Sequence, residues 1–483
     1  MTQSLNPDDR HLGLITDLYE LTMAAGYHVY GMADEHATFE LWVRRLPSCR
    51  NYLVAAGLEQ AIHYLQHLSF APEQIVYLRE HPAFRYVPND WFERLEHFRF
   101  ECDVWAIPEG TVVFAGEPLL RVSGPLMQAQ IVETYLITAL TVQTLIASKA
   151  ARIVTAAQGR PVFDFGSRRA HGPQAGLLAA RAAYLAGCTG TSNTEAGRLL
   201  GLPTLGTQAH SWIMSFTDEQ EAFRKFGQLF PDHSTLLLDT YDTIQGACKA
   251  VASGAAMQAV RLDSGDLEYL SKQARAMFDK ADLKEVKIVA SNELDEYVIQ
   301  ELVANKAPID LFGVGTKLVT ANGDPALTCA YKLAAKKENR RHTPVIKISN
   351  NPEKITIPGI KNIIRIYDDA TMLGDLVYLE KEKTPLENKL KKKEPLTFYH
   401  PYYSDEYVHI SNYRRGEILL KPAVKDGAIV YDFPALTEIQ RKAKDALGHL
   451  HPSYKRLLNP HRYKVSITKQ LRDLKLKLME RYK

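Results

Sequence analysis

Cysteine is scarce in this chain, and its spacing is unsuited to cross-links or metal binding. Five cysteines occur among 483 residues, and no two form a CxxC pair: Cys49, Cys102, Cys188, Cys248 and Cys329. An odd number of widely separated cysteines argues against a disulfide framework and against a structural zinc site. A reducing cytoplasm fits this pattern best.

An excess of one charge and long apolar runs are also missing. The 59 basic and 56 acidic residues leave a net charge of +3, which is too balanced to predict nucleic acid as the main partner. No apolar run approaches the roughly 20 residues that span a bilayer. Residues 1–10 are polar and lack the apolar core of an export signal. We therefore expect a soluble protein with neither a membrane nor a nucleic-acid partner.

Two common catalytic signatures, HExxH and GxSxG, do not occur. What is present is an ordinary globular composition, with 46% hydrophobic and 24% charged residues. The length exceeds what one hydrophobic core usually serves, so two or three domains are expected, and one of them has room for a barrel of roughly 250 residues. A helix over residues 14–30, a strand over 36–43 and a long helix over 128–158 are predicted before the pattern changes.

From Pro161 onward, short apolar runs alternate with stretches of helical periodicity. The runs with strand character include 162–165, 236–238, 259–262, 287–290 and 311–314. Repeated strand–helix units predict an α/β fold with a parallel sheet, closed as an irregular TIM-like barrel. Farther on, the Lys- and Glu-rich residues 380–396 are typical of a solvated loop.

Three clusters of Gly, hydroxyl, Arg and His residues follow one another within sixty positions. They lie at residues 163–172, 190–194 and 206–211. Glycine allows the backbone to approach a ligand closely, hydroxyls donate hydrogen bonds, and arginine forks suit carboxylate and phosphate. One such cluster is usually a turn, but three in series favour a site for an anionic small molecule.

Acidic residues follow two further predicted strands. Asp239 and Asp242 come after one, and Asp263 and Asp266 come after the next, in which Arg261 precedes them. Carboxylates at strand ends can hold Mg²⁺ together with a phosphorylated substrate, or accept hydrogen bonds from ribose hydroxyls. The alternative is helix capping, and different members of each pair can serve each purpose. Residues 312–316 offer glycines and a threonine suited to cradling a phosphate.

Two residues stay ambiguous on composition alone. His210 can be a general base, a metal ligand or a packed histidine, and His171 has no better claim. Tyr19, near the start of the first predicted helix, is most simply a packed tyrosine. The residues by themselves therefore predict a barrel enzyme that binds a phosphorylated sugar with Mg²⁺, and leave the reaction open.

A resemblance narrows the reaction. Ordered motifs lie at residues 16–19, 164–169, 190–193, 206–211, 261–266 and 313–316, with further matches at 358–361 and 459–461. Together they resemble the nicotinate phosphoribosyltransferase family over nearly the whole chain. The resemblance implies an N-terminal α/β domain over 12–136, a barrel domain over 158–345 and a small C-terminal domain over 365–475.

The resemblance also implies an activity and its partners. Nicotinate and phosphoribosyl pyrophosphate would give nicotinate mononucleotide and pyrophosphate in NAD salvage, with Mg²⁺ and with coupled hydrolysis of ATP through a phosphohistidine at His210. The family works as a homodimer with shared active sites. Tyr19 would then stack on the pyridine ring from the other subunit, opposite Phe165, which reverses its interpretation as a packed tyrosine. Arg44 or Arg45 would add charge from that subunit.

The remaining roles are carried over position by position. Arg168 would meet the carboxylate of nicotinate, and Thr207 and Arg261 would lie near the ring and its ribose. Asp239 and Asp263 would hold the ribose hydroxyls and Mg²⁺-pyrophosphate. The 5′-phosphate would be cradled by Gly315 and Thr316.

Four other functions are less consistent with the sequence. The related nicotinamide enzyme has an Asp where this chain has Ser192, and an Asp there would repel the carboxylate of nicotinate. Quinolinate phosphoribosyltransferases are much shorter and lack the loop that holds His210. A non-catalytic ligand sensor is disfavoured because every expected catalytic position is filled. An unrelated phosphosugar isomerase would need an acid–base pair, such as His210 with Asp239.

Overall fold

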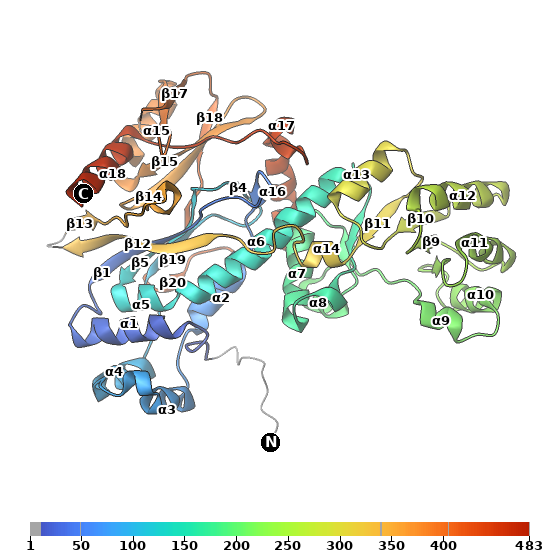
Figure 1. Ribbon diagram of the computed structural model, residues 1–483, viewed down its shortest axis with the longest axis horizontal. Helices are drawn as coiled ribbons and strands as arrows, with labels where there is room; N and C mark the ends of the chain where they lie inside the picture. Colours follow the sequence, from blue (N-terminus) through green and yellow to red (C-terminus); the bar gives the residue numbers. More distant parts are fainter. Residues whose placement is uncertain (1–10, 49, 339–340, 404, 483) are drawn as a thin grey trace. The chain divides into compact units, whose positions relative to one another are not determined.

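The structure is a computed structural model that describes residues 11–48, 50–338, 341–403 and 405–482. The chain divides into two compact units (Figure 1). Unit 1 consists of residues 1–144, 326–435 and 445–483, and unit 2 of residues 145–325 and 436–444. The predicted domains at 12–136 and 365–475 thus fall largely within unit 1, and most of the predicted barrel domain falls within unit 2.

Unit 1 contains a seven-stranded antiparallel sheet with the order β13–β12–β1–β5–β3–β19–β20. Its strands are β1 (His36–Val43), β3 (Asp103–Ala106), β5 (Pro118–Pro125), β12 (Cys329–Glu338), β13 (Arg341–Pro344), β19 (Lys421–Lys425) and β20 (Ala428–Ile429). Strand β1 lies between β5 and β12, with Leu41 opposite both Leu120 and Tyr331. Strands from the two ends of the chain therefore form one sheet.

A second, six-stranded sheet of unit 1 has the order β17–β16–β21–β15–β14–β18. Its strands are β14 (Lys361–Tyr367), β15 (Met372–Leu379), β16 (Leu396–Tyr399), β17 (Tyr407–Ile410), β18 (Arg415–Ile418) and β21 (Val465–Ile467). Only the pairing of β15 with β21 is parallel. A short pair, β2 (Leu53–Val54) with β4 (Val112–Val113), completes the strands described in this unit.

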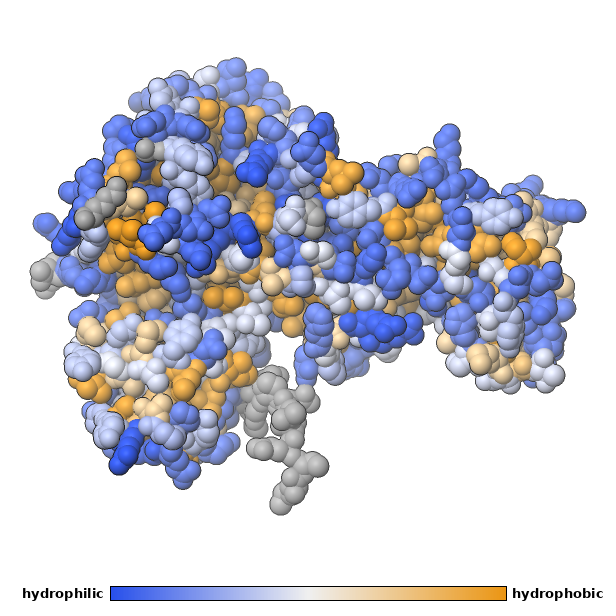
Figure 2. Space-filling model, in the orientation of Figure 1, coloured by the Kyte–Doolittle hydropathy of each residue, from blue (hydrophilic) through white to orange (hydrophobic). Residues whose placement is uncertain are grey.

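Helices and one large hydrophobic core hold unit 1 together. The helices are α1 (Leu18–Val29), α2 (Leu58–His67), α3 (Pro72–Glu80), α4 (Asn89–Glu96), α5 (Leu126–Ile131), α15 (Lys383–Lys392), α17 (Pro452–Lys455) and α18 (Lys469–Arg481). The core runs from Leu12 to Leu471 in sequence, so the N-terminal and C-terminal segments bury their apolar side chains in the same cluster. Figure 2 shows hydrophilic side chains over much of the visible surface, with apolar patches between them.

One helix among the described residues is long and apolar enough to cross a membrane. It is α6 (Glu133–Ala156), and 72% of its apolar window is buried inside the protein. The expectation that no stretch approaches that length was therefore wrong by length and composition. Its burial explains the apolar sequence, because a core helix needs the same residues as a membrane span.

Unit 2 is built on a six-stranded parallel sheet with the order β7–β6–β11–β10–β9–β8. The strands are β6 (Val162–Asp164), β7 (Gly190–Thr191), β8 (Thr235–Leu237), β9 (Ala259–Leu262), β10 (Lys287–Ala290) and β11 (Leu311–Val314). Between and after them lie α7 (Pro173–Leu185), α8 (Thr194–Leu200), α9 (His210–Met214), α10 (Glu219–Leu229), α11 (Thr243–Ala252), α12 (Leu267–Lys280), α13 (Glu296–Ala304) and α14 (Thr316–Val319). The predicted parallel α/β arrangement is confirmed.

The two edge strands of this sheet, β7 and β8, are joined by an irregular segment. On one side the backbone N–H of Thr191 donates to Pro203 O (3.0 Å), and that of Leu205 donates to Thr191 O (3.1 Å). On the other side the side chain of Gln208 accepts a hydrogen bond from the N–H of Leu237 (3.1 Å). Residues 203–208 thus contact both edge strands, while the six paired strands of the described residues form a sheet whose edges, β7 and β8, are not paired with each other.

Two sequence-based element predictions differ from the structure. Residues 380–396 contain the helix α15 rather than a solvated loop, because Leu386 and Leu390 pack against the core beneath the second sheet. The single helix predicted over 128–158 is divided into α5 and α6 at Val132. The last helix to be named, α16 (Leu436–His449), contributes residues to both units, as α6 does.

Candidate active site

Most of the predicted site residues lie in unit 2 at one edge of the parallel sheet. Phe165, Ser192, Asp239, Asp263 and Gly315 follow the carboxyl ends of β6, β7, β8, β9 and β11 within two positions. Parallel strands bring their carboxyl ends to the same edge, where sites of such folds are built. The strand order therefore gathers residues that are up to 150 positions apart in the sequence.

Arg261 is the centre of a hydrogen-bonded network at this edge. Its guanidinium donates from Nη1 to Thr207 Oγ1 (2.8 Å), from Nη2 to Asp263 Oδ1 (2.7 Å) and from Nε to Ser291 Oγ (2.8 Å). The hydroxyl of Ser291 in turn donates to Asp263 Oδ1. Such a fork fixes the orientation of a largely buried charge, which a flexible ammonium would not.

Asp239 is held beside this network with one carboxylate oxygen unsatisfied. Its Oδ2 accepts from the N–H of Asp263 (3.2 Å) and from Ser264 Oγ (2.5 Å). Its Oδ1 is buried and has no hydrogen-bond partner among the described residues. A buried carboxylate oxygen without a partner is unfavourable on its own, so Asp239 is suited to a cation or a hydroxyl of a bound molecule.

The capping alternative is resolved separately for each pair of acidic residues. The side chain of Asp242 accepts from the N–H of Gln245 (2.8 Å) at the start of α11, and that of Asp266 accepts from the N–H of Tyr269 (3.0 Å) at the start of α12. Asp239 makes its contacts with the neighbouring strand end instead. The second member of each pair therefore caps a helix, and the first remains at the candidate site.

Glycines let the loops after β6 and β11 approach each other. A Cβ on Gly313 would lie 2.3 Å from the ring of Phe165, and a Cβ on Gly166 would lie 2.1 Å from Val319. The N–H of Phe165 donates to Val314 O (2.8 Å). The guanidinium carbon of Arg261 lies 5.8 Å from the centre of the Phe165 ring. The aromatic ring is thus fixed between the glycine strand and the arginine.

A buried carboxyl group supports the loops after β6 and β7. Asp164 accepts from the N–H of Gly166 (2.8 Å) and from Thr191 Oγ1 (2.8 Å). Burial raises its pKa, and these two hydrogen bonds oppose the rise. The N–H of Ser192 donates to the backbone O of Asp164 (2.8 Å), which leaves the exposed side chain of Ser192 at the sheet edge.

His210 begins the short helix α9 and is exposed. Its Nδ1 lies 3.2 Å from Thr240 Oγ1, a residue that directly follows Asp239. The threonine occupies Nδ1, so Nε2 is the ring nitrogen that remains for a further partner. This contact brings the histidine cluster of the sequence next to the acidic strand end.

The remaining predicted site residues do not belong to the hydrogen-bonded network around Arg261. Arg168 lies in the short 3-10 helix Ser167–Arg169 after β6, and Thr316 is the first residue of α14 after β11. Arg168 is exposed without an ion pair or hydrogen bond among the described residues. Tyr19, Arg44 and Arg45 belong to unit 1. Tyr19 is 47% exposed, so it is not a core tyrosine.

Sequence reasoning missed three residues of this edge: Thr240, Ser264 and Ser291. Ser291 directly follows the predicted strand at 287–290, so its position behind β10 was the available signal. Its role depends on Arg261, which lies 30 positions earlier, and no local pattern carries that pairing. The described residues contain no group of three His, Cys, Asp or Glu side chains arranged to hold a metal. Asp239 and Asp263 therefore suit Mg²⁺ only if a substrate supplies further oxygen ligands.

A parallel α/β sheet with charged and hydroxyl side chains at its carboxyl edge is the arrangement in which α/β enzymes build their active sites. Three protein-family models match this chain and identify its family. They are the nicotinate phosphoribosyltransferase N-terminal domain over residues 14–141, the nicotinate phosphoribosyltransferase family over 161–389 and the corresponding C-terminal domain over 360–475. The chain belongs to the nicotinate phosphoribosyltransferase family, which confirms the resemblance found in its motifs.

Individual relatives support the same assignment. The chain is 37% identical to a nicotinate phosphoribosyltransferase of Bacillus subtilis, over 95% of this chain and 94% of that one. It is 44% identical to a nicotinate phosphoribosyltransferase of Mycobacterium tuberculosis, over 78% and 80% of the two chains. The crystal structure of human nicotinic acid phosphoribosyltransferase matches with a TM-score of 0.82 and 28% identity, covering 96% of this chain and 99% of that one.

Proposed function

We propose that this chain transfers the phosphoribosyl group of phosphoribosyl pyrophosphate to nicotinate, giving nicotinate mononucleotide and pyrophosphate in NAD salvage. The pyridine nitrogen forms a bond to the anomeric carbon of the ribose. The bond from that carbon to the pyrophosphate oxygen breaks, and pyrophosphate leaves with the electron pair. Nicotinate already has a lone pair on its ring nitrogen, so the reaction needs no general base. The enzyme has to hold the leaving group and stabilise a cationic ribosyl carbon.

The network around Arg261 is the observation that carries this proposal. It combines a guanidinium, two hydroxyls and the carboxylate of Asp263 in fixed contacts at one sheet edge. Preorganised charge of this kind stabilises a transition state without the cost of reorienting solvent. In the proposed complex, Arg168 meets the carboxylate of nicotinate, Phe165 stacks on its ring, and Gly315 with Thr316 contacts the 5′-phosphate.

Asp239 and Asp263 would hold Mg²⁺ together with the pyrophosphate of the substrate. The unpartnered Oδ1 of Asp239 supports this placement. When bound, the ion neutralises charge that develops on the leaving pyrophosphate. The protein contributes by fixing Asp239 through Ser264 and the N–H of Asp263 before the substrate arrives.

His210 is the proposed site of coupling to ATP. In this scheme a ring nitrogen attacks the terminal phosphorus of ATP, ADP leaves, and water later cleaves the N–P bond to release phosphate. The contact of Nδ1 with Thr240 leaves Nε2 as the attacking atom. A phosphate on His210 adds negative charge and acceptor oxygens next to Asp239, which can change the affinities for substrate and product within a cycle.

The proposed active form is a cytoplasmic homodimer with shared sites. Tyr19 belongs to unit 1 and is half exposed, so its ring is accessible to a second subunit. Ser192 would favour nicotinate over nicotinamide, because it places no negative charge beside the carboxylate. An Asp at this position would stand next to Asp164, whose backbone O binds the N–H of Ser192.

Product formation from phosphoribosyl pyrophosphate and Mg²⁺ tests the proposal. The assay uses nicotinate and nicotinamide in parallel, each with and without ATP. We expect nicotinate mononucleotide to form faster with ATP and little product from nicotinamide. The variant His210→Ala should keep the basal rate and lose the stimulation by ATP and the formation of a phosphoprotein.

The matched control for His210→Ala is His171→Ala. His171 is also an exposed histidine of a glycine-rich loop in unit 2, and the network around Arg261 does not involve it. Equal stimulation by ATP in both variants would refute the role of His210 but leave the transfer reaction standing. A clear preference for nicotinamide would refute the argument from Ser192.

A further inference from the structure

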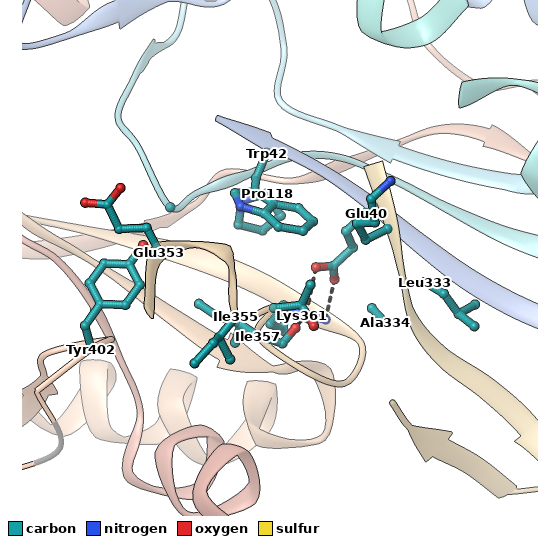
Figure 3. Close-up of a pocket in the computed structure, with 13 residues that line it drawn as sticks. Glu40, Trp42, Pro118, Leu333, Ala334, Glu353, Ile355, Ile357, Lys361 and Tyr402 are labelled. Atoms are coloured by element: carbon teal, nitrogen blue, oxygen red, sulfur yellow. Dashed lines mark hydrogen bonds and ion pairs between the residues drawn. The ribbon is translucent and has the colours of Figure 1, made fainter. Parts of the chain in front are cut away.

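Unit 1 contains two adjoining cavities that share Ile355 and Tyr402 in their lining. Figure 3 shows the first, in which the ion pair of Glu40 with Lys361 lies below Trp42. This cavity has a volume of about 20 Å³, which is room for a water molecule. The ammonium of Lys361 is fully satisfied, because it also donates to Ile357 O (2.6 Å) and Gly359 O (2.7 Å). The first cavity is therefore structural.

The second cavity is larger and differently lined. Its volume is about 170 Å³, and cavities of about 150 Å³ accommodate molecules the size of benzene. It lies among helix α18, the loop after β16 and the short 3-10 helix Pro352–Lys354. Its apolar wall consists of Pro352, Ile355, Pro401, Ile467, Leu476 and Met479. Such walls suit a ligand with an aliphatic body.

Lys475 is the polar group of this cavity that stands out. The residue is 6% exposed, and its Nζ donates to Pro401 O (2.7 Å). Among the described residues, no carboxylate lies within ion-pair distance of it. Burial lowers the pKa of Lys475 to about 8, so the ammonium still predominates at neutral pH. Buried charges in proteins are usually paired, and this one faces a space large enough for its counter-ion.

The other ionisable groups around the cavity do not supply that counter-ion. Arg472 is paired with Asp473 (2.7 Å) and lies over the ring of Tyr399 at 4.1 Å. His400 accepts at Nδ1 from the N–H groups of Tyr402 and Tyr403 (3.1 Å each), and burial lowers its pKa, with Glu406 opposing this. No acidic side chain is found among the described residues that line the cavity. The cavity thus carries a net positive charge inside apolar walls.

We propose that this second cavity binds a small organic anion with an aliphatic body, of the short-chain carboxylate class, and that Lys475 pairs with its carboxylate. The site belongs to unit 1 and uses none of the residues assigned to phosphoribosyl transfer. The carboxylate supplies the charge that Lys475 lacks, and Tyr402, whose ring centre is 5.4 Å from Nζ, covers the ammonium from one side. The chain of the ligand lies against Leu476, Met479 and Ile467.

Hexanoate is the probe for this site. Isothermal titration of the full-length protein should show saturable 1:1 binding of hexanoate and much weaker binding of hexanamide, which has the same body without the charge. Lys475→Met keeps the aliphatic volume but removes the ammonium, and should weaken binding by about tenfold or more. Lys477→Met is the matched control, because Lys477 is exposed on the same helix and should change nothing.

A second measurement does not depend on the folding of any variant. In the wild-type protein, acetic anhydride should acetylate Lys475 more slowly when hexanoate is present, while the acetylation rate of Lys477 should be unchanged. Peptide mass spectrometry measures the acetylation of both lysines. Equal binding of hexanoate and hexanamide would overturn the proposal. So would hexanoate binding that is unchanged by Lys475→Met, or acetylation of Lys475 that hexanoate does not slow.

Discussion

The single guanidinium of Arg261 donates hydrogen bonds to three different acceptors, and these three bonds make the residue important for the geometry of the candidate site. Thr207, Asp263 and Ser291 come from three separate segments, and each contributes one oxygen. Lysine would keep the positive charge but offers a single flexible ammonium, which cannot reproduce three donors in a plane. The charge and the geometry of this residue can therefore be tested separately.

Arg261→Lys should lower kcat/KM for nicotinate mononucleotide formation by about 100-fold, since misplaced preorganised groups cost that order of rate. Steady-state kinetics with both substrates varied measures this. Arg275→Lys is the control, because Arg275 also donates to three acceptors, on α12, away from the strand ends. A similar loss in both variants would show that stability, and not the site, depends on Arg261.

Glu20 in α1 is a carboxyl group whose pKa lies near neutral pH. It is fully buried, and burial raises its pKa from 4.5 to about 7, although Gln130 donates to its Oε2. The folded protein then holds this proton more tightly than the unfolded chain does. The contribution of Glu20 to the free energy of unfolding therefore falls as the pH rises from about 4.5 to about 7, and it is constant above that range.

Glu20→Gln should remove this pH dependence. Glutamine keeps an acceptor for Gln130 and carries no charge, so the variant should be more stable than the wild type by about 1–3 kcal/mol at pH 8 and nearly equal to it at pH 5. Urea unfolding at both pH values measures the difference. Glu35→Gln, at an exposed position, should leave the profile unchanged. A stabilisation by Glu20→Gln that is the same at both pH values would contradict the assignment.

At the scale of elements, a buried ion cluster fastens α6 to α13 within unit 2. Glu296 is fully buried and lies 2.6 Å from Lys149 Nζ and 2.9 Å from Arg152 Nε. Arg152 also donates to the hydroxyl of Tyr297 (3.2 Å). Burial opposes the charge of Glu296, but the two cations keep its pKa below the ordinary value. Removing the anion would leave two buried cations uncompensated.

Glu296→Gln should lower the free energy of unfolding by about 3–5 kcal/mol at pH 7. The difference should shrink as the pH falls below the ordinary glutamate pKa of 4.5 and through the lowered pKa of Glu296, because Glu296 then becomes protonated in the folded protein as well. Chemical denaturation at several pH values measures it. Glu301→Gln, on the exposed side of the same helix, serves as the control. A loss that stays constant with pH would refute the electrostatic explanation.

Local patterns predicted the parallel strands well, because each short apolar run is followed by a helix with its own periodicity. The same patterns predicted that Asp239 and Asp263 follow strands, and the strand order then brings them together. The contacts of residues 203–208 with both edge strands were not predictable, since that segment has no regular strand pattern. The helix α15 was missed because its many lysines mask the two leucines that pack inward.

Long-range pairings were the least predictable part of the site and of the fold. Ser291 and Thr240 become significant only through partners from other strands. In the sequence, Lys475 cannot be distinguished from the other lysines of a charged helix. Its burial depends on residues 352–355 and 400–402, which are distant in the sequence and pack over it. Sequence periodicity reports which face of an element is buried, but not what lies against it.

At the scale of the whole molecule, the proposed dimer makes a complementation experiment possible. If Tyr19 acts in the site of the other subunit, Tyr19→Ala and Asp239→Asn chains should each be nearly inactive alone. Mixed dimers contain one site with both native residues, so co-refolding equal amounts should restore about a quarter of the wild-type activity. No recovery in mixtures that form dimers would contradict shared sites. Tyr30→Ala is the control, because Tyr30 is another exposed tyrosine of unit 1, at the end of α1. An equal loss of activity in Tyr19→Ala and Tyr30→Ala would show that the effect is not specific to Tyr19.

The order of strands in unit 1 has a consequence for synthesis on the ribosome. Strands β1, β3 and β5 are made early, but their outer neighbours β12 and β19 follow only after the whole of residues 145–325. Until then, a three-stranded nascent sheet has two open edges, which are the features that promote mispairing between chains. Unit 2 is complete in sequence, apart from residues 436–444, before that sheet is closed. A chain that terminates before β12 should therefore aggregate even though all of its candidate active-site residues have been made.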